Sequence, residues 1–304
     1  MGGRLVLPHA EAGPDAQGGF SRLQRFVHKA WSQKLAPMYY RLLQTVPGIA
    51  LPVHLPFGGW WLARNDFCGA ALLGEGFENS ERRFVEVLLR PGMTVLDIGA
   101  HHGFYTLLAS RKVGPLGHVL AFEPSPRERH KLRQHLRLNR CRNVRVESCA
   151  LGETDAVAEL FLVQGGETGC NSLRKPNVMT STTVVRVRVT RLDKILEQQG
   201  ISRVDFVKLD VEGGELGVFK GSTGLLHRAV RPVMLIEVYD IRTEPWGYKA
   251  REIITFLHGL GFDWFQPLED GGLEPIDVHR ESYDGNFVAM PEERAAEFSY
   301  LMEK

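Results

Sequence analysis

The chain has 304 residues, of which 43% are hydrophobic and 24% are charged, the balance of a globular protein with a complete core. Its 37 basic and 36 acidic residues leave a net charge of +1, so the overall charge does not indicate a polyanionic partner. No apolar run approaches the ~20 residues of a membrane span, and the length fits one large domain with an appendage, or at most two domains.

The first segment, residues 1–18, is rich in Gly, Ala and Pro, and we expect it to be disordered. It lacks the long apolar core of a secretory leader. The four cysteines form neither a CxxC pair nor a zinc-like spacing, which is typical of reduced thiols rather than of a disulfide framework. These features predict a cytoplasmic protein.

A basic segment follows. Residues 20–47 carry apolar side chains at helical spacing, interrupted at Pro37, and no acidic residue occurs between Asp15 and Asp66. The sequence therefore predicts a basic helical extension over residues 19–64. Such a helix can lie on an anionic membrane, or it can pack on the domain or on a second subunit. Both arrangements stay open, so the expected location is cytoplasmic or peripheral to a membrane.

From residue 77 onward, predicted strands and helices alternate, which indicates an α/β domain over residues 65–304 with a Rossmann-like, doubly wound, mostly parallel sheet. The sheet has seven expected strands, at residues 94–98, 118–122, 143–147, 205–210, 233–239, 263–267 and 286–290. Two further runs, 157–164 and 182–190, alternate with period two and predict an inserted antiparallel β-hairpin.

A glycine-rich turn follows the first strand of this domain. The turn, Gly99 to Gly103, presents backbone N–H groups and a helix N-terminus to a ligand, and its glycines allow close approach. The second strand ends at Glu123, where an acid can accept both hydroxyls of a ribose. Neighbouring histidines on a turn rarely bind one metal, so we predict no metal site at His101 and His102.

Ionisable residues gather after the fourth and fifth long strands. Lys208, Asp210 and Glu212 alternate, so on a strand they project to one side, and Glu237 ends the neighbouring strand. A reaction at an alcohol needs a base within reach of the hydroxyl, and Asp210 or Glu212 suits that role. The same acids could instead hold a divalent cation, or they could pair with Lys208 merely to fix the strand end.

Several motifs occur in order at familiar intervals, among them "VLDIGAHHGFYT" (95–106), "FEPSP" (122–126), "CNSL" (170–173), "FVKLDVEGGE" (206–215), "LIEV" (235–238) and "NFVAM" (286–290). Over residues 65–290 the chain resembles the FkbM family of class I S-adenosylmethionine-dependent methyltransferases. His101 departs from the family pattern, which usually has asparagine there.

The resemblance implies that S-adenosylmethionine is the cofactor and that one set of residues contacts it: Asp97, Gly99, Ala100, His101, Gly103, Phe104, Tyr105, Thr106, Glu123, Pro124, Cys149, Ala150 and Asp210. The catalytic set is then Lys208, Asp210, Glu212 and Glu237. The loop at residues 165–175 is flexible and polar, so we expect Asn171 and Ser172 to contact the acceptor, together with Tyr239.

The expected function is O-methylation of a small molecule or glycan: a hydroxyl of a sugar, a glycoconjugate or another natural product. Two other functions stay open. Residues 127–142 are strongly basic, which would suit an RNA methyltransferase, although a nucleic-acid partner is not favoured by the overall charge. A non-catalytic S-adenosylmethionine-binding protein is the second. A nicotinamide dehydrogenase is disfavoured because its GxGxxG motif is absent.

Overall fold

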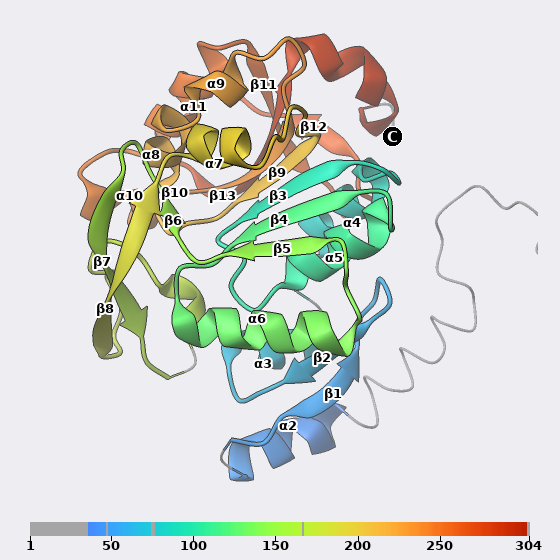
Figure 1. Cartoon of the computed structure of the whole chain (residues 1–304), viewed down its shortest axis with the longest axis vertical. Coiled ribbons are helices and arrows are strands. Elements are labelled where there is room, and N and C mark those ends of the chain that lie inside the picture. The colour runs from blue at the N-terminus through green and yellow to red at the C-terminus, as the bar shows by residue number, and fades with distance from the viewer. Residues whose placement is uncertain (1–35, 47, 74–76, 166, 303–304) are drawn as a thin grey trace, which may run out of the picture.

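The computed structural model describes residues 36–46, 48–73, 77–165 and 167–302 (Figure 1). The expected disorder of residues 1–18 and the first part of the predicted basic helix lie outside these ranges. Within them, no helix combines the length and the apolar character needed to cross a bilayer.

A central sheet of eight strands forms the middle layer, in the order β12-β11-β13-β10-β9-β3-β4-β5. Strands β10, β9, β3, β4 and β5 are mutually parallel, whereas β13 runs antiparallel to its neighbours. The strands are β3 (Thr94–Ile98), β4 (His118–Phe122), β5 (Val144–Glu147), β9 (Phe206–Leu209), β10 (Val233–Tyr239), β11 (Phe262–Pro267), β12 (Leu273–Pro275) and β13 (Asp284–Pro291). The seven predicted strands are all present, and the short edge strand β12 is the one that was not expected.

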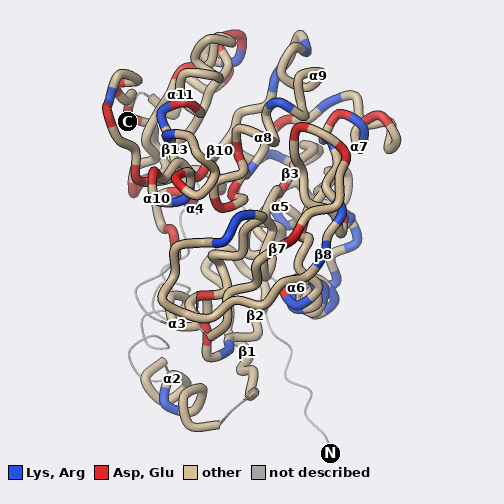
Figure 2. Tube along the Cα trace, turned by 90° about the vertical axis from the view of Figure 1, so that its left-hand side faces the viewer, with Lys and Arg blue, Asp and Glu red and all other residues tan. Residues whose placement is uncertain are grey.

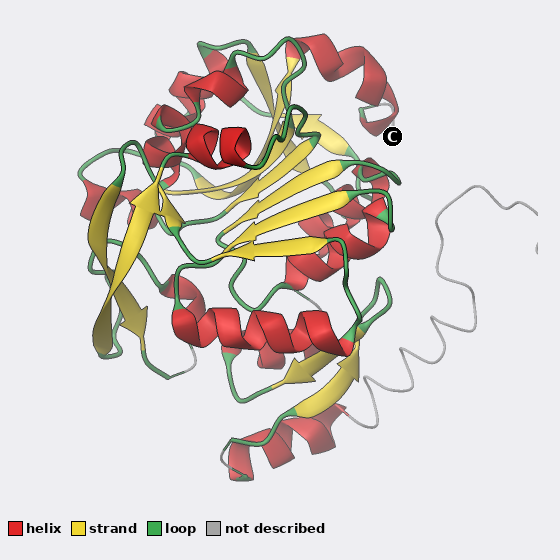
Figure 3. Ribbon diagram, viewed as in Figure 1, coloured by secondary structure: helices red, strands yellow, loops and turns green. Residues whose placement is uncertain are grey.

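Helices cover both faces of this sheet (Figure 3). The strands are buried on both sides, so successive residues belong to different cores: Val95 packs in one hydrophobic cluster and Leu96 in the other. The first cluster includes residues of α4 (Asn79–Leu88), α5 (Phe104–Val113), α6 (Pro126–Leu138) and η3 (Glu292–Leu301). The second includes residues of α7 (Leu192–Gln198), α8 (Glu215–Lys220), α9 (Thr223–Leu226) and α11 (Arg251–His258).

The predicted β-hairpin is present between β5 and α7. Strands β7 (Ala156–Val163) and β8 (Thr182–Thr190) pair antiparallel along their whole length. A third strand, β6 (Ala150–Leu151), adds to β8, so the insert is a separate three-stranded sheet. Its apolar side chains pack together in a small cluster of their own. Short helices complete the chain: η1 (Thr168–Cys170), α10 (Asp240–Thr243) and η2 (Glu244–Trp246).

The part of the extension that the structure describes is only partly helical. Helix α2 (Ala36–Thr45) begins one residue before Pro37, which a first turn tolerates. Residues 51–63 form an antiparallel hairpin of β1 (Leu51–His54) and β2 (Trp60–Ala63), so the helical prediction is wrong there. The short helix α3 (Phe67–Leu73) then leads into the domain.

The β1–β2 hairpin contacts α6 through His135, whose side chain is fully buried. Nδ1 of His135 lies 2.7 Å from the carbonyl oxygen of His102, and Nε2 accepts a hydrogen bond from the Leu62 N–H at 3.2 Å. The imidazole also stacks on Trp61, with 3.9 Å between ring centroids. The extension is thus tied to the glycine-rich turn.

Candidate active site

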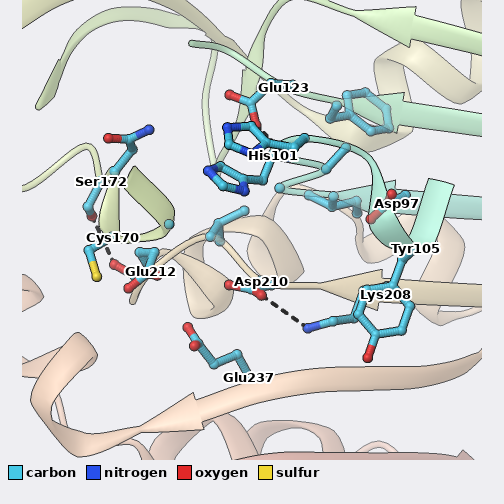
Figure 4. Close-up of a pocket in the computed structure, with 18 of the residues that line it drawn as sticks. Asp97, His101, Tyr105, Glu123, Cys170, Ser172, Lys208, Asp210, Glu212 and Glu237 are labelled. Carbon is cyan, nitrogen blue, oxygen red and sulfur yellow. Dashed lines mark hydrogen bonds and ion pairs between the residues drawn. The ribbon is translucent and has the colours of Figure 1, made fainter. Parts of the chain in front are cut away.

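A cavity of about 610 Å³ lies at the carboxyl ends of the parallel strands, where open α/β sheets bind ligands (Figure 4). Most of the predicted site residues line it: Asp97, Gly99, Ala100, His101, Phe104, Tyr105, Glu123, Pro124, Cys149, Ala150, Asn171, Ser172, Lys208, Asp210, Glu212, Glu237 and Tyr239. The sequence therefore places residues from distant segments in one chamber of the size usual for small-molecule sites.

The turn after β3 is shaped by Gly99. This residue has φ +87°, and a Cβ added to it would lie 1.7 Å from the carbonyl oxygen of Asp210. Gly99 and Ala100 both donate their N–H to the carbonyl oxygen of Phe122, at 3.0 and 2.9 Å. Only glycine allows this close approach of β3, β4 and β9 at the edge of the cavity.

Glu123 closes the turn from the side of β4. Its two carboxylate oxygens accept hydrogen bonds from the main-chain N–H of His101, at 2.7 Å, and of Ser125, at 2.8 Å. Burial raises the pKa of Glu123 to about 8, against these two hydrogen bonds, which lower it. Each oxygen keeps a further lone pair for a ligand hydroxyl.

Two predicted cofactor residues do not line the cavity. Gly103 instead faces α6, where an added Cβ would lie 2.3 Å from Leu132 Cδ1. Thr106 is fully buried and donates a hydrogen bond to Asp97. Burial raises the pKa of Asp97 to about 6. Gly103 thus packs against α6, and Thr106 holds Asp97, which does line the cavity.

A chain of polar contacts continues from β9. The Lys208 ammonium donates to Asp210 Oδ2 at 3.2 Å and to Asn286 Oδ1 at 3.3 Å, and it lies 5.5 Å from the ring centroid of Tyr105. Burial alone would lower the pKa of Lys208, but the carboxylates of Asp210 and Glu78 raise it above its usual value. Lys208 is therefore a buried, charged group that orients Asp210.

Glu212 reaches the same place by a different route from the one predicted. Strand β9 ends at Leu209, and Glu212 lies in a turn with φ 56°, a left-handed conformation rare for a residue with a side chain. Its carbonyl oxygen accepts hydrogen bonds from Ser172 Oγ at 2.8 Å and Trp246 Nε1 at 3.1 Å. The turn, rather than strand alternation, brings the carboxylate to Asp210.

The carboxylates of Asp210, Glu212 and Glu237 gather within 4.8 Å of one another. Burial and the neighbouring Asp210 raise the pKa of both Glu212 and Glu237 well above the usual value. Arg242 Nε opposes this at Glu212, 2.8 Å from Oε2, in an ion pair without the alignment of a hydrogen bond. Glu237 Oε2 is buried and has no hydrogen-bond partner among the described residues.

The two histidines of the turn stack on each other, with 3.7 Å between ring centroids. His101 Nε2 lies 3.2 Å from Thr168 Oγ1, and His102 Nε2 lies 3.0 Å from the Lys131 ammonium. Cys68 Sγ is 3.7 Å from His101 Nδ1, and potential ligand atoms of Cys68, His101 and His102 lie within 4.8 Å of one another. Burial lowers the pKa of His101 to about 4, which makes it a neutral wall of the cavity.

Several lining residues were not predicted from the sequence: Trp61, Phe67, Phe77, Glu78, Glu81, Arg242, Trp246 and Asn286. Glu78 precedes α4 with φ 45° and accepts a hydrogen bond from the Tyr105 hydroxyl. Its pKa is raised to about 7 by burial. The positive φ of Glu78 is a conformation that sequence alone does not reveal.

The expected acceptor residues lie on the opposite wall. Ser172 is committed to the Glu212 carbonyl, and Asn171 Oδ1 accepts a hydrogen bond from the Val163 N–H at 2.8 Å. Ser172 thus joins the insert to the turn that carries Glu212, whereas Asn171 bonds within the insert. Tyr239 is half-buried beside Glu237.

The donor set fits a nucleoside sulfonium such as S-adenosylmethionine. Glu123 offers carboxylate oxygens to a vicinal diol, and Gly99, Ala100 and His101 line the cavity beside it. Cys149 and Ala150 give an apolar surface suited to an adenine ring. Acids outnumber bases around the chamber, as a cationic ligand requires.

Comparison with known proteins identifies the family of the chain. The family profile described as the methyltransferase FkbM domain matches residues 97–263, more than half of the chain. A protein named methyltransferase 1 from Beauveria bassiana is 33% identical over 42% of this chain and 57% of its own length. The 31-O-demethyl-FK506 methyltransferase FkbM of Streptomyces tacrolimicus is 27% identical over 71% of this chain and 87% of its own length.

Other matches differ widely in coverage. The AMB antimetabolite synthetase AmbE of Pseudomonas aeruginosa is 27% identical over 58% of this chain, which spans 10% of that long protein. The crystal structure of methyltransferase FkbM from Methylobacillus flagellatus KT aligns with 85% of this chain and 60% of its own, at 14% identity and a TM-score of 0.41. The match thus spans about a tenth of the length of AmbE and just over half of the length of methyltransferase 1.

Proposed function

The chain belongs to the FkbM family of methyltransferases, and we propose that it transfers a methyl group from S-adenosylmethionine to a hydroxyl of a sugar, a glycoconjugate or another natural product. One observation carries the proposal: Glu123 and the carboxylates of Asp210, Glu212 and Glu237 line a single cavity. A relative named for 31-O-demethyl-FK506 supports oxygen as the methyl acceptor.

The cofactor half of the cavity holds its ligand by residues of β3 and β4. When bound, S-adenosylmethionine supplies an electrophilic methyl group on a sulfonium. Glu123 would hold the ribose hydroxyls, and the turn at Gly99 to His101 would contact the amino-acid end. Acidic side chains that line the cavity would favour the positive charge there.

The acceptor half must remove a proton from a hydroxyl that is barely ionised at neutral pH. Glu212 suits the task because its raised pKa makes it a stronger base than an exposed carboxylate. Asp210, fixed by Lys208, would orient the hydroxyl. Arg242 would hold the Glu212 carboxylate in position by their ion pair, while the pKa of Glu212 stays above its usual value. Lys208 and Arg242 already supply positive charge to the cluster, so a base role is favoured over a cation site.

A labelled-methyl transfer assay tests this proposal. The full chain is incubated with S-adenosylmethionine and panels of sugars, glycolipids and hydroxylated macrocycles, and products are read by the mass gain of one methyl group. With the accepted compound, we expect Glu212→Gln to lower kcat by about 100-fold or more while affinity for S-adenosylhomocysteine stays unchanged.

A matched control is Glu153→Gln, because Glu153 is an exposed acid whose closest cation, Lys220, is 3.9 Å away. It should keep full kcat. If Glu212→Gln and Asp210→Asn both kept full turnover, the catalytic assignment would be wrong. Methylation of RNA, and of none of the alcohols, would instead point to the nucleic-acid alternative.

A further inference from the structure

Apolar side chains gather at one end of the molecule, which we call the α2 end. α2 and the β1–β2 hairpin form the lower end in Figure 1, with α6 next above them. Six large apolar side chains of this end are between 36% and 55% exposed: Met38, Tyr40, Leu42, Val46, Trp60 and Leu138. Single exposed apolar residues are ordinary, but this many in neighbouring elements are not.

The sequence of α2 explains its part of this surface. Met38, Leu42 and Val46 are four residues apart, so they form one stripe along the outside of the helix. Leu43, from another side of the helix, is buried in the core of the domain. The outward stripe is therefore in addition to the residues that fold the helix onto the protein.

The hairpin and the end of α6 continue the surface. The Trp60 N–H donates to Asn139 Oδ1, and the Asn139 amide donates to the Trp60 carbonyl oxygen, both at 2.7 Å. Leu138 is the residue before Asn139, and both Leu138 and Trp60 are exposed. Two segments more than 70 residues apart in sequence thus bring exposed apolar residues to the same joint between α6 and the hairpin.

Basic residues surround this apolar surface. Arg41, Arg111, Arg137 and Arg140 are exposed, and an added Cβ on Gly58 in the hairpin turn would lie 2.7 Å from Arg111 Nη2. Residues 36–65 contain no acid, and the acid of α6, Glu128, is completely buried. Figure 2 shows Lys and Arg gathered along α6. The α2 end is therefore both apolar and positively charged.

This combination selects among partners. A second copy joined by a two-fold axis would bring arginines against arginines. The phosphates of a nucleic acid would pair with the arginines, but they would not bury the aliphatic stripe of α2. A bilayer with anionic headgroups satisfies both: Trp, Tyr and aliphatic side chains enter the interface, and arginines meet the lipid phosphates. We propose that the α2 end docks on membrane surfaces that contain anionic phospholipid.

Sedimentation of the full chain with lipid vesicles tests the proposal. We expect binding to vesicles of phosphatidylcholine with phosphatidylglycerol, weak binding to phosphatidylcholine alone, and loss of binding as salt rises. Arg137→Glu with Arg140→Glu should weaken binding at least about tenfold, since each basic residue near the surface contributes about 1 kcal/mol. Leu42→Ser with Trp60→Ser should weaken it comparably.

Matched controls come from the insert. Val157→Ser with Val184→Ser, and Arg186→Glu alone, alter exposed residues away from the α2 end and should leave binding unchanged. S-adenosylhomocysteine binding, measured for every variant, confirms that each one is folded. This readout also keeps a failure of the membrane proposal separate from a failure of the proposed function.

Three results would overturn the proposal. The first is equal binding to neutral and anionic vesicles, or to neither. The second is concentration-dependent dimerisation that Leu42→Ser abolishes, which would make the α2 end a subunit interface. The third is tight, salt-sensitive binding of an RNA oligonucleotide that depends on the same arginines, with no vesicle binding.

Discussion

Glu123 illustrates how a single buried residue can be arranged for a ligand. Two main-chain N–H groups hold its carboxylate in place without using all of its lone pairs. Even so, burial raises the pKa of Glu123 to about 8. Hydrogen bonds donated by the hydroxyls of a ligand would stabilise the ionised form of Glu123. Ionisation of Glu123 and binding of such a ligand are therefore linked.

Replacement of Glu123 by alanine should weaken S-adenosylhomocysteine binding at least about tenfold, because a hydrogen bond to a charged group contributes about 1.5–3 kcal/mol. Titration calorimetry measures the loss. Glu123→Gln should lose less, since its amide oxygen still accepts one N–H. Unchanged affinity in Glu123→Ala, with an unchanged melting temperature, would show that the cofactor binds elsewhere.

The raised pKa of Glu123 also predicts a pH dependence. A raised carboxyl pKa means that the neutral form prevails below about pH 8 in the free protein, whereas the ribose hydroxyls bind best to the ionised form. Affinity should therefore fall as pH drops from 8, by up to about tenfold per pH unit. Calorimetry between pH 6 and pH 9 checks this, and the Glu123→Gln curve should be flatter. An identical curve for both proteins would assign the titration to other groups.

At the scale of single elements, the turn between β3 and α5 depends on Gly99. Gly99→Ala should destabilise the fold by about 2–4 kcal/mol, because the added Cβ would lie 1.7 Å from a main-chain oxygen and φ is +87°. Urea unfolding measures the change. Gly217→Ala is the matched control: Gly217 lies inside α8 with the nearest heavy atom to an added Cβ at 4.0 Å, so stability should rise by about 0.5–1 kcal/mol.

The joint between the β1–β2 hairpin and α6 makes another element-scale prediction. His135→Phe keeps the stacking on Trp61 but removes the partners of the Leu62 N–H and the His102 carbonyl. We expect a loss of about 2–4 kcal/mol in the free energy of unfolding. His130→Phe on the same helix should change it by less than about 0.5 kcal/mol, because His130 is exposed. Equal effects of both variants would remove the special role of the joint.

How far sequence predicts this fold depends on the pattern around each element. The parallel strands alternate with helices along the chain, and β7 and β8 show period-two alternation over eight and nine residues, and these predictions are confirmed. The hairpin at residues 51–63 has two four-residue strands, the first of which contains Pro52, and β12 has three residues, and neither belongs to such a regular pattern. Their formation depends on partners distant in sequence.

The same reasoning applies to the site. Residues inside motifs, such as Glu123 and Asp210, could be predicted to lie together because strand ends share one edge of a sheet. Glu78, Arg242 and Trp246 reach the cavity from loops whose course is set by tertiary packing, and no local pattern identifies them. Gly103 and Thr106 lie within a motif, yet they support the turn from outside the cavity.

At the scale of the whole molecule, the cavity is lined by parts distant in sequence, among them the strand ends of the central sheet, α3, and the insert between β5 and α7. None of them encloses the chamber alone. A ligand that contacts the sheet and the insert would therefore stabilise the arrangement of the entire protein, not only the residues beside it.

Saturation with S-adenosylhomocysteine should accordingly raise the melting temperature by several degrees, since a ligand at about a hundredfold excess over Kd contributes about 2.7 kcal/mol. Differential scanning calorimetry measures the shift. Adenosine triphosphate, which carries the same nucleoside but is strongly anionic, should give a smaller shift at an acidic cavity. A larger shift with the triphosphate would contradict the charge argument.

The peptide oxygen of Glu212, shared by Ser172 and Trp246, has a practical consequence. A bulky acceptor that displaces the insert would also displace the backbone of Glu212, the proposed base. The size of the acceptor and the rate of its methylation are therefore coupled. Enzyme engineers who widen the entrance at Ser172 to admit larger alcohols should find turnover blunted along with selectivity.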